Sequence, residues 1–399
     1  MVLEISLFIA YLFLGPILWI LFAIGAASSR RRMQMLRKRE LGIPDPPPLV
    51  TILIPAKDEG ARIGDCLASA LGQDYPNFSV LAIDDRSGDA TGRVMDDLAK
   101  SNAKLKVLHI DHLPAGWTGK NNALYRGAAL ATGEWLLFID SDVILQRDAL
   151  TRTLAVATGK NYDLLSLILR LETPGIWESI LIPLASAAFG AAFMMGMSNS
   201  DSNNYFFGNG QFMLMRRTAY DKIGGHEAVK TQFNEDMVLA RIMKQSGQRV
   251  RIAWGTHLGS VRMYDSLATI LRGWSRIFFG SSSGSPWRSV VAMLFILLGC
   301  YPAYAAIAWG VYRMLHPVGI CTGYPWLGTA GFHIVLMTVQ LGIVYRWMGN
   351  RAIYALLFPV AAPFILFVLA RSVWMCLTGK VHWRGTRYSH EIQPTPTRE

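Results

Sequence analysis

The sequence predicts an α/β protein with a mostly parallel, doubly wound sheet. One N-terminal and about three C-terminal transmembrane helices, with further helices in the membrane plane, hold it at a membrane. Strands alternate with amphipathic helices in the first third of the chain, a pattern typical of βαβ units. Four apolar stretches are long enough to cross a bilayer. Charged residues make up only 17% of the chain, well below the roughly 25% of an ordinary soluble domain.

An apolar run at the start of the chain predicts an N-terminal membrane anchor. Residues 2–25 are almost uninterrupted apolar, which is enough to cross a hydrocarbon core of about 30 Å. Six cations follow, namely Arg30, Arg31, Arg32, Arg37, Lys38 and Arg39. No Lys or Arg precedes the run, so the pattern favours an uncleaved anchor over a signal peptide. The basic flank then indicates a cytoplasmic side that rests on anionic lipid, in preference to a nucleic-acid-binding patch.

Three more apolar stretches lie at about 289–312, 325–345 and 353–377. Arg346 and Arg351 flank the turn between the last two and indicate a cytoplasmic turn. The tail carries further cations at Lys380, Arg384, Arg387 and Arg398. Counting spans places this tail on the opposite side, against the positive-inside rule. Either one stretch is re-entrant or the tail departs from the rule.

The chain is expected to divide at changes of composition. The predicted segments are an anchor (1–27), a basic and Pro-rich linker (28–48), an α/β domain (49–263), an amphipathic interfacial segment (264–286), transmembrane helices (287–378) and a polar tail (379–399). Four cysteines without a close pair give neither a disulfide framework nor a zinc-ligand pattern.

Within the α/β domain, four strands and three helices alternate. Strands are predicted at 49–55, 78–84, 105–110 and 134–140, and helices at 61–73, 88–100 and 121–131, with Asp89 as a cap for the second helix. In a parallel sheet of this kind, ligands bind outside the carboxyl ends of the strands. The polar residues directly after each strand are therefore the candidates for a binding site.

Those residues are mostly acidic. Pro55, Lys57 and Glu59 follow the first strand, Asp84 and Asp85 end the second, and Asp140 and Asp142 follow the fourth. The D-x-D spacing lets two carboxylates project the same way. They would offer oxygen ligands to Mg²⁺ or Mn²⁺, which takes its other ligands from phosphate and water. A solvated loop is the alternative, but the second aspartate pair one unit earlier favours the metal site.

These segments resemble the family 2 glycosyltransferases, which have the GT-A fold. The resemblance covers roughly 49–280 and rests on four motifs, namely TILIPAKDE (51–59), AIDDRSGDAT (82–91), HLPAGWTGKNNALYRGAALATGEWLLFIDSDV (112–143) and FNEDMVLARIMKQSG (233–247). The GWTGK sequence is similar to the membrane-bound, lipid-modifying branch, which includes ceramide glucosyltransferases and hopanoid- and carotenoid-associated enzymes. The Q-x-x-R-W motif of processive synthases is missing, because Arg272 lies two residues before Trp274. The resemblance therefore implies a single transfer.

The resemblance also implies residue roles for inverting transfer from a nucleotide-diphosphate sugar, with UDP-glucose expected, to a hydroxyl of a membrane lipid such as ceramide. Asp236 is the expected base, with Glu235 orienting it. Asp142 is the expected metal ligand, with Asp140 as a further ligand or a ribose contact. Pro55, Lys57, Glu59, Asp84, Asp85 and Lys120 are expected on the donor side. Trp117, Asn209, Arg272, Trp274 and Arg276 are acceptor-side or diphosphate candidates.

Structural alternatives exist for several of these residues. Glu235 and Asp236 also suit the N-terminus of a helix, Trp117 also suits a packing position, and Asn209 also suits a turn. His112, His226 and His257 are isolated, which favours structural or acceptor-side positions over metal ligation.

Two apolar segments are expected to lie in the membrane plane. If residues 176–197 crossed the membrane, Asp142 and Asp236 would lie on opposite sides, so this stretch is predicted to be interfacial or re-entrant. Residues 264–280 show an amphipathic pattern. The catalytic domain is expected to face the cytoplasm, in a bacterial inner membrane or a Golgi-type membrane.

Other functions compete with this one. The acceptor could instead be polyprenyl phosphate or a polysaccharide, although a polymerase should carry Q-x-x-R-W. A non-catalytic nucleotide-sugar-binding protein is a further alternative, but Asp142 and Asp236 are both present. A transporter is disfavoured by the large α/β domain.

Overall fold

The computed structural model describes residues 2–33, 36, 42–193, 195–282, 285–317, 323–378, 381–383 and 386–388. Some of the cations named above lie outside these residues, namely Arg37, Lys38, Arg39, Lys380, Arg384 and Arg398. The chain divides into two compact units. The helical unit consists of Met1–Arg31, Thr173–Phe193 and Tyr264–Arg387, and the sheet unit consists of Arg32–Glu172, Met194–Met263 and Tyr388–Glu399.

A seven-stranded sheet organises the sheet unit, with the strand order β3-β2-β1-β4-β8-β6-β9. The strands are β1 Val50–Ala56, β2 Phe78–Asp85, β3 Leu105–Ile110, β4 Trp135–Phe138, β6 Leu164–Ile168, β8 Met213–Arg216 and β9 Val250–Trp254. Strands β3, β2, β1 and β4 are parallel, β8 is antiparallel to both neighbours, and β6 pairs in parallel with β9. The predicted mostly parallel sheet is confirmed.

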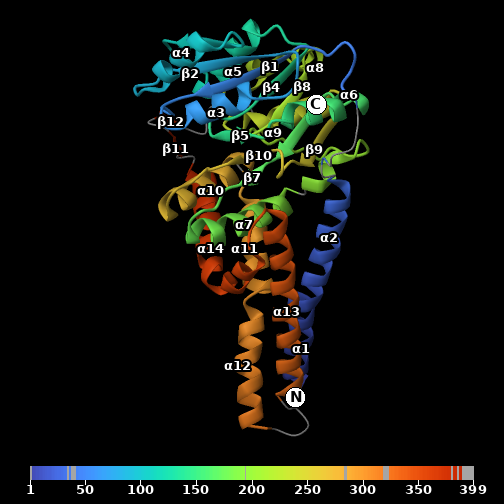
Figure 1. Ribbon diagram of the computed structural model, residues 1–399. Helices are drawn as coiled ribbons and strands as arrows, with labels where there is room; N and C mark the ends of the chain where they lie inside the picture. Colours follow the sequence, from blue (N-terminus) through green and yellow to red (C-terminus); the bar gives the residue numbers. More distant parts are fainter. Residues whose placement is uncertain are drawn as a thin grey trace, which may run out of the picture. The chain divides into compact units, whose positions relative to one another are not determined.

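Helices cover both faces of this sheet (Figure 1). They are α3 Ile63–Leu71, α4 Thr91–Ser101, α5 Gly119–Leu130, α6 Ala149–Gly159, α8 Arg217–Lys222 and α9 Glu235–Gln245, with the 3₁₀ segments η2 Met195–Asn199 and η3 Gly225–Val229. Apolar residues of α3, α4 and α6 form one core cluster, and those of α5 and α9 form another. Asp89 lies one residue before the N-cap Ala90 and accepts a hydrogen bond from the N–H of Thr91.

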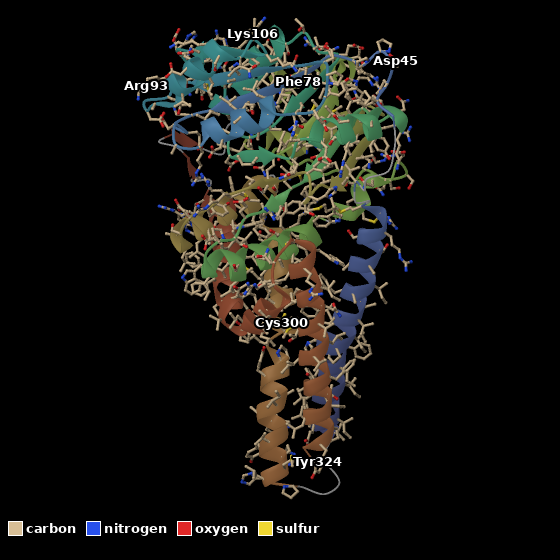
Figure 2. The ribbon with its side chains drawn as sticks, in the orientation of Figure 1. Asp45, Phe78, Arg93, Lys106, Cys300 and Tyr324 are labelled. Atoms are coloured by element: carbon tan, nitrogen blue, oxygen red, sulfur yellow. The ribbon has the colours of Figure 1, made fainter. Side chains whose placement is uncertain are left out.

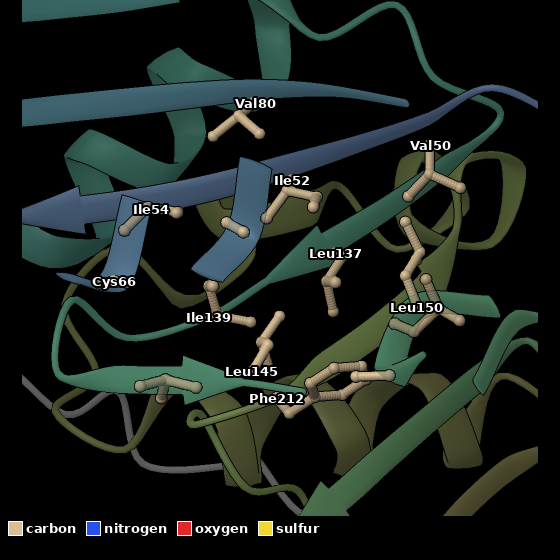
Figure 3. Packing of buried hydrophobic residues seen from close by; sticks show 14 of the residues in the cluster. Val50, Ile52, Ile54, Cys66, Val80, Leu137, Ile139, Leu145, Leu150 and Phe212 are labelled. Carbon is tan, nitrogen blue, oxygen red and sulfur yellow. The ribbon is translucent and has the colours of Figure 1, made fainter. Parts of the chain in front are cut away.

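The two clusters meet at β1, which is buried along its whole length. Ile52 and Ile54 belong to the cluster with α3, and Leu53 belongs to the cluster with α5. All three are 0% exposed, so each stabilises the fold by roughly 1.5–3 kcal/mol. Figure 3 shows Ile52 and Ile54 packed with Leu137 and Ile139. This central strand fixes the edge at which the polar loops emerge.

Smaller sheets complete the strands. β5 Val143–Leu145 pairs antiparallel with β10 Gly259–Val261, which in turn pairs parallel with β7 Arg170–Leu171. β11 Val381–Trp383 and β12 Thr386–Tyr388 form a two-stranded sheet.

Among the described residues, the helical unit contains four helical segments that are long and apolar enough to cross a membrane. They are Val2–Ser29, Trp287–Leu315, Tyr324–Trp347 and Ala352–Thr378. Their parts are α1 Val2–Leu12, the π-helix η1 Phe13–Ile17, α2 Leu18–Arg32, α11 Trp287–Gly299, α12 Pro302–Leu315, α13 Tyr324–Trp347, η4 Ala352–Leu357 and α14 Phe358–Thr378. One N-terminal and three C-terminal spans are thus confirmed as candidates. The remaining helices are α7 Ile176–Ala192 and α10 Leu267–Ser281, whose in-plane placement stays a prediction.

A polar network joins the apolar helices where α11 ends and α12 begins. Figure 2 labels Cys300 at this break. His333 Nε2 lies 3.0 Å from the Gly299 carbonyl oxygen, and its Nδ1 lies 3.1 Å from the Tyr11 hydroxyl. Trp19 donates to the same carbonyl at 2.6 Å. One tautomer satisfies every bond, with Nε2–H donating to Gly299 and Tyr11 donating to Nδ1. Tyr11, Trp19 and His333 thus satisfy their polar atoms within the apolar helices.

Candidate active site

The polar loops after β1, β2 and β4 emerge at one edge of the sheet, because these three strands are parallel neighbours. Ala56 is in register with Asp84, so the end of β1 lies beside the end of β2. The loop after β4 begins at the neighbouring position and carries Asp140 and Asp142. The predicted gathering of carboxylates at this edge is therefore observed.

Lys120 connects this edge to the start of α9. Its Nζ lies 2.7 Å from Asp140 Oδ1 and 2.7 Å from Glu235 Oε1. Burial by itself would lower the pKa of Lys120, but Asp140, Glu235 and Asp236 together raise this pKa well above its ordinary value. Lys120 is therefore a fixed positive charge that lies between Asp140 and Glu235, the neighbour of the expected base Asp236.

Asp236 is a half-buried carboxylate with two backbone donors. The Gly210 N–H donates to Oδ2 at 2.8 Å, and the Met237 N–H donates to Oδ1 at 2.7 Å. Burial and the neighbouring Glu235 charge raise the pKa of Asp236 to about 7, against the opposing effects of Lys120 and the two N–H groups. A general base works best when its pKa lies near the working pH. The raised pKa suits the general-base role that the sequence predicts for Asp236, and this role stays a prediction.

Asp142 lies in a crowded acidic environment. Burial, followed by the charges of Asp140 and Glu59, raises the pKa of Asp142 to about 7. Within the described ranges, no group of three or more His, Cys, Asp and Glu side chains is arranged to hold a metal ion. Mg²⁺-type ions commonly take one or two carboxylates and complete their shell with water and phosphate. These acidic side chains therefore fit a divalent cation that arrives with a phosphate ligand.

Side-chain and backbone contacts of Asp85 and Arg86 hold the turn after β2. Asp85 accepts two hydrogen bonds from Arg86, at 2.8 Å from Nε and 3.0 Å from Nη2. A side chain at Gly119 would lie 2.3 Å from Asp85 Oδ2, so the absence of one lets this carboxylate reach the start of α5. Lys57 Nζ donates to the Asp85 and Arg86 carbonyls at 3.3 and 3.1 Å. Asp58 and Arg86 have φ values of 55° and 57°, a left-handed conformation that is often found at functional turns.

A small cavity of about 10 Å³, roughly the room that one water molecule needs, lies between these elements. Its lining residues are Pro55, Lys120, Leu124, Phe138, Ile139, Asp140, Gly210, Met213, Met215, His226 and Glu235. The lining thus combines charged side chains with apolar ones.

The family of the chain is decided by a match over nearly its whole length. The family model described as glycosyl transferase family 21 matches residues 17–395. The chain belongs to this family. The sequence-based resemblance to membrane-bound glycosyltransferases and the prediction of an enzyme are therefore confirmed.

Individual relatives of this glycosyltransferase are more distant. It is 25% identical over 356 residues to 4,4'-diaponeurosporenoate glycosyltransferase of Staphylococcus aureus strain USA300, a match that covers 85% of this chain and 88% of the relative. Mannosyltransferase PcManGT from Pyrobaculum calidifontis, solved in complex with GDP-Man and Mn²⁺, is similar with a TM-score of 0.53 and 17% identity. That match covers 94% of this chain and 97% of the other. At this identity, the likeness shows the fold alone, and the GT-A fold is confirmed.

Other predicted site residues of the glycosyltransferase take part in local structure or belong to the helical unit. Trp117 packs against Tyr125, with ring centroids 5.0 Å apart. The Asn209 side-chain amide donates to the Leu167 carbonyl at 2.9 Å, as expected for a turn residue. Three further candidates lie on α10 in the helical unit, namely Arg272, Trp274 and Arg276. Their roles stay predictions.

Sequence reasoning did not name Gly210 or His109 near the site, and it expected His226 only in a structural or acceptor-side position. His226 lines the pocket, and burial and the Lys120 charge lower its pKa to about 3, so its ring is neutral. Gly210 supplies the N–H that holds Asp236. His109 contacts Asp84 from the neighbouring strand. The glycine-flanked turn at 208–210 was a visible signal for Gly210, whereas the two histidines depend on tertiary contacts.

Proposed function

We propose that this glycosyltransferase transfers a single hexose from UDP-glucose to a hydroxyl of a membrane lipid such as ceramide, with inversion at the sugar. The observation that carries the proposal is the position of Lys120 between Asp140 and Glu235, beside Asp236. This arrangement joins a donor edge rich in carboxylates to a base of suitable pKa. Both parts are needed when a hydroxyl attacks a nucleotide-diphosphate sugar.

Asp236 acts as the base in this proposal. Its carboxylate takes the hydroxyl proton as the acceptor oxygen forms a bond to the anomeric carbon, and the bond from that carbon to the diphosphate breaks. The nucleoside diphosphate leaves with the bonding electrons. A single displacement of this kind inverts the configuration. Glu235 keeps Lys120 in place, and the positive charge of Lys120 offsets the negative charge around Asp236 and so favours its ionised form.

The donor is proposed to lie along the loops after β1, β2 and β4. Asp85 would contact the nucleoside, and Lys57 holds the turn that carries it. Asp142, with Asp140, would hold a divalent metal, Mg²⁺ or Mn²⁺, which supplies charge neutralisation for the departing diphosphate. The Mn²⁺ and GDP-Man in the solved structure of similar fold support this placement by analogy.

The acceptor class is supported by the basicity of Asp236. A hydroxyl must lose its proton to attack, whereas a carboxylate or a phosphate is already ionised at neutral pH and needs no base. The Staphylococcus aureus relative is named for a carboxylate acceptor, diaponeurosporenoate, which makes a carotenoid acid the second candidate. A polyprenyl phosphate or polysaccharide acceptor is less well supported, the latter because Q-x-x-R-W is missing.

The six predicted segments, from the anchor (1–27) to the polar tail (379–399), are proposed as the division of the chain. The catalytic domain (49–263) is proposed to face the cytoplasm, and the membrane is proposed to be a bacterial inner membrane. The exposed Arg31 and Arg32, which follow the first apolar helix, support this sidedness. Residues 176–197 would lie in the membrane plane. Cysteines introduced at Ser202 and Arg86 test both points, because the two should react from the same side and that side should be the cytoplasmic one. Labelling of these two positions from opposite sides would contradict the arrangement.

The function is tested by nucleoside-diphosphate release from the purified, detergent-solubilised protein. UDP-glucose, UDP-galactose, UDP-N-acetylglucosamine and GDP-mannose are each supplied with Mg²⁺ or Mn²⁺ and a lipid extract. Mass spectrometry then identifies the product lipid. We expect UDP release from UDP-glucose and a lipid that is heavier by one hexose. Release with another donor would replace the sugar assignment, and a glycosylated carotenoid acid would replace the acceptor assignment.

A further inference from the structure

His109 bridges two carboxylates next to the donor edge of the sheet. It lies on the edge strand β3, in register with Asp84 on β2. His109 Nδ1 lies 3.1 Å from Asp84 Oδ2, and His109 Nε2 lies 3.0 Å from Asp96 Oδ1. Asp96 belongs to α4, so the imidazole joins two strands and a helix. Only a doubly protonated ring can donate to both carboxylates, because a neutral ring has one N–H.

The first turn of α4 leaves room for this contact because Gly92 has no side chain. A Cβ at Gly92 would lie 2.6 Å from Asp84 Oδ2 and 3.3 Å from His109 Cε1. The Asp84 side chain is 13% exposed and the His109 side chain is 44% exposed. The bridge is thus packed on the Asp84 side and open to water on the imidazole side, where a proton can enter and leave.

The bridge continues into the turn that carries the expected nucleoside contact. The other Asp84 oxygen, Oδ1, accepts a hydrogen bond from the Ser87 N–H at 3.2 Å. Both Asp84 oxygens are therefore used to hold the turn, while Asp85 points to the start of α5. The next residue of the turn, Gly88, donates to Asp58 Oδ1 at 2.8 Å. The conformation of this turn thus depends on where Asp84 is held.

We propose that His109 is a positioning residue for the donor site, where its protonated ring clamps Asp84 to Asp96 and holds the turn that presents Asp85 to the nucleoside. This inference rests on the proposed use of Asp85 in donor binding. It adds a residue outside the pocket and makes donor affinity depend on one proton.

The pH range follows from the groups that face the ring. Those groups are Asp96 from α4 and Asp84 from β2. The hydrogen bond to Asp96 raises the pKa of His109 above its ordinary value of 6.5, partial burial opposes this, and Asp84 adds to the increase. Because the pKa of His109 is raised in the folded protein, the ring is protonated and holds both carboxylates below pH 6.5. This contact is lost as the pH rises through the raised pKa. Donor affinity should weaken over that interval.

The experiment measures UDP binding to the full chain in detergent with Mg²⁺, by titration calorimetry, between about pH 5.5 and 9. The useful quantity is the ratio of the UDP Kd of a variant to that of the wild type. The titrations of UDP and of other carboxyls affect both proteins and cancel in this ratio. For His109→Phe we expect a ratio of about fivefold to tenfold at acid pH, the loss of roughly one charged hydrogen bond, falling towards one at alkaline pH.

Asp96→Ala provides a second variant that leaves the imidazole in place. It should weaken UDP affinity at acid pH by less than His109→Phe does, because the protonated ring still contacts Asp84. It should also lose affinity at a lower pH than the wild type, because Asp96 makes the largest contribution to the raised pKa. His257→Phe, at an exposed histidine after β9, is the matched control and should give a ratio near one throughout.

The outcomes separate this inference from the proposed function. Ratios that do not change with pH, or that stay near one, would overturn the role of His109 while leaving donor binding intact. Wild-type protein that binds no UDP at any pH would overturn the proposed donor and the role of His109 together. The inference is supported if the Kd ratio of His109→Phe falls as the pH rises and if Asp96→Ala loses UDP affinity at a lower pH than the wild type.

Discussion

Lys120 Nζ and Glu235 Oε1 lie 2.7 Å apart, although 114 residues separate them in the sequence. The same ammonium also contacts Asp140 at 2.7 Å. One cation therefore holds the start of α9 against the loop after β4. Because Asp236 follows Glu235 directly, this ion pair sets both the position and the electrostatic environment of the proposed base.

Replacing Lys120 by Met should abolish most of the activity. We expect kcat/KM to fall by about 10²–10³-fold, as for the loss of a preorganised charge. The Lys120 charge lowers the pKa of Asp236, so its removal should also shift the acidic limb of the pH–rate profile to higher pH. Lys100→Met is the matched control, because the Lys100 side chain is 75% exposed. An unshifted acidic limb would mean that Lys120 does not control the ionisation of the base.

Asp236→Asn should separate binding from chemistry. We expect kcat to fall by about 10²–10⁴-fold while UDP affinity stays within about twofold of the wild type. In the wild type, the Asp236 pKa of about 7 predicts that kcat/KM falls as the pH drops below this value, since the protonated carboxyl cannot accept the hydroxyl proton. Asp221→Asn, at an exposed carboxylate paired with Arg217, is the control. Full turnover by Asp236→Asn would assign the base elsewhere, or would point to an acceptor that is already ionised.

Removal of divalent metal should stop the reaction. Excess chelator is expected to abolish UDP release, and Mg²⁺ or Mn²⁺ should restore it. Asp142→Ala should weaken metal-dependent UDP binding by about tenfold or more, because one charged oxygen ligand is lost. The UDP-release assay checks the first effect, and binding calorimetry with and without metal checks the second. Activity that persists in excess chelator would show that Lys120 and backbone N–H groups neutralise the diphosphate without a metal.

The sequence predicted the parts of the fold that depend on local pattern. Buried β-branched runs located β1 and its neighbours, and the residues directly after them, such as Asp84 and Asp142, could be placed at one sheet edge from topology alone. Four long apolar segments located the candidate spans. These features follow from burial and periodicity, which can be recognised in the sequence as apolar runs and regular spacing.

Contacts that depend on strand register or on segments far apart in the sequence could not be predicted from such patterns. The pairing of His109 with Asp84 requires the exact offset between β2 and β3, which neither strand specifies alone. The Gly210 N–H reaches Asp236 only because the turn before β8 packs against the start of α9. Sequence reasoning named Asn209 in that turn, but its amide is used for local structure.

His333→Leu tests the polar network of the helical unit. The change removes the bonds to Tyr11 and to the Gly299 carbonyl while keeping an apolar side chain of similar bulk. We expect the free energy of unfolding in detergent to fall by about 1–3 kcal/mol for two interhelical hydrogen bonds. His316→Leu is the control, since His316 is exposed after α12. Equal stability of both variants would show that water replaces these bonds without loss.

Gly210→Ala tests whether the backbone aims the base. A Cβ at this position would lie 3.3 Å from both Asp236 Oδ2 and Lys120 Nζ, so one of these groups must move. We expect kcat to fall by about tenfold to a hundredfold, because a small displacement of a reacting group is costly, with UDP affinity unchanged.

Gly64→Ala in α3 is the matched control for this substitution, because the nearest atom to its new Cβ would be 3.7 Å away. Its activity should equal that of the wild type, and its unfolding free energy should rise by roughly 0.5–1 kcal/mol. If Gly210→Ala kept wild-type kcat, the Gly210 N–H would not be what aims Asp236. The Met237 N–H and the rigidity of α9 would then have to hold the carboxylate without help from the turn before β8.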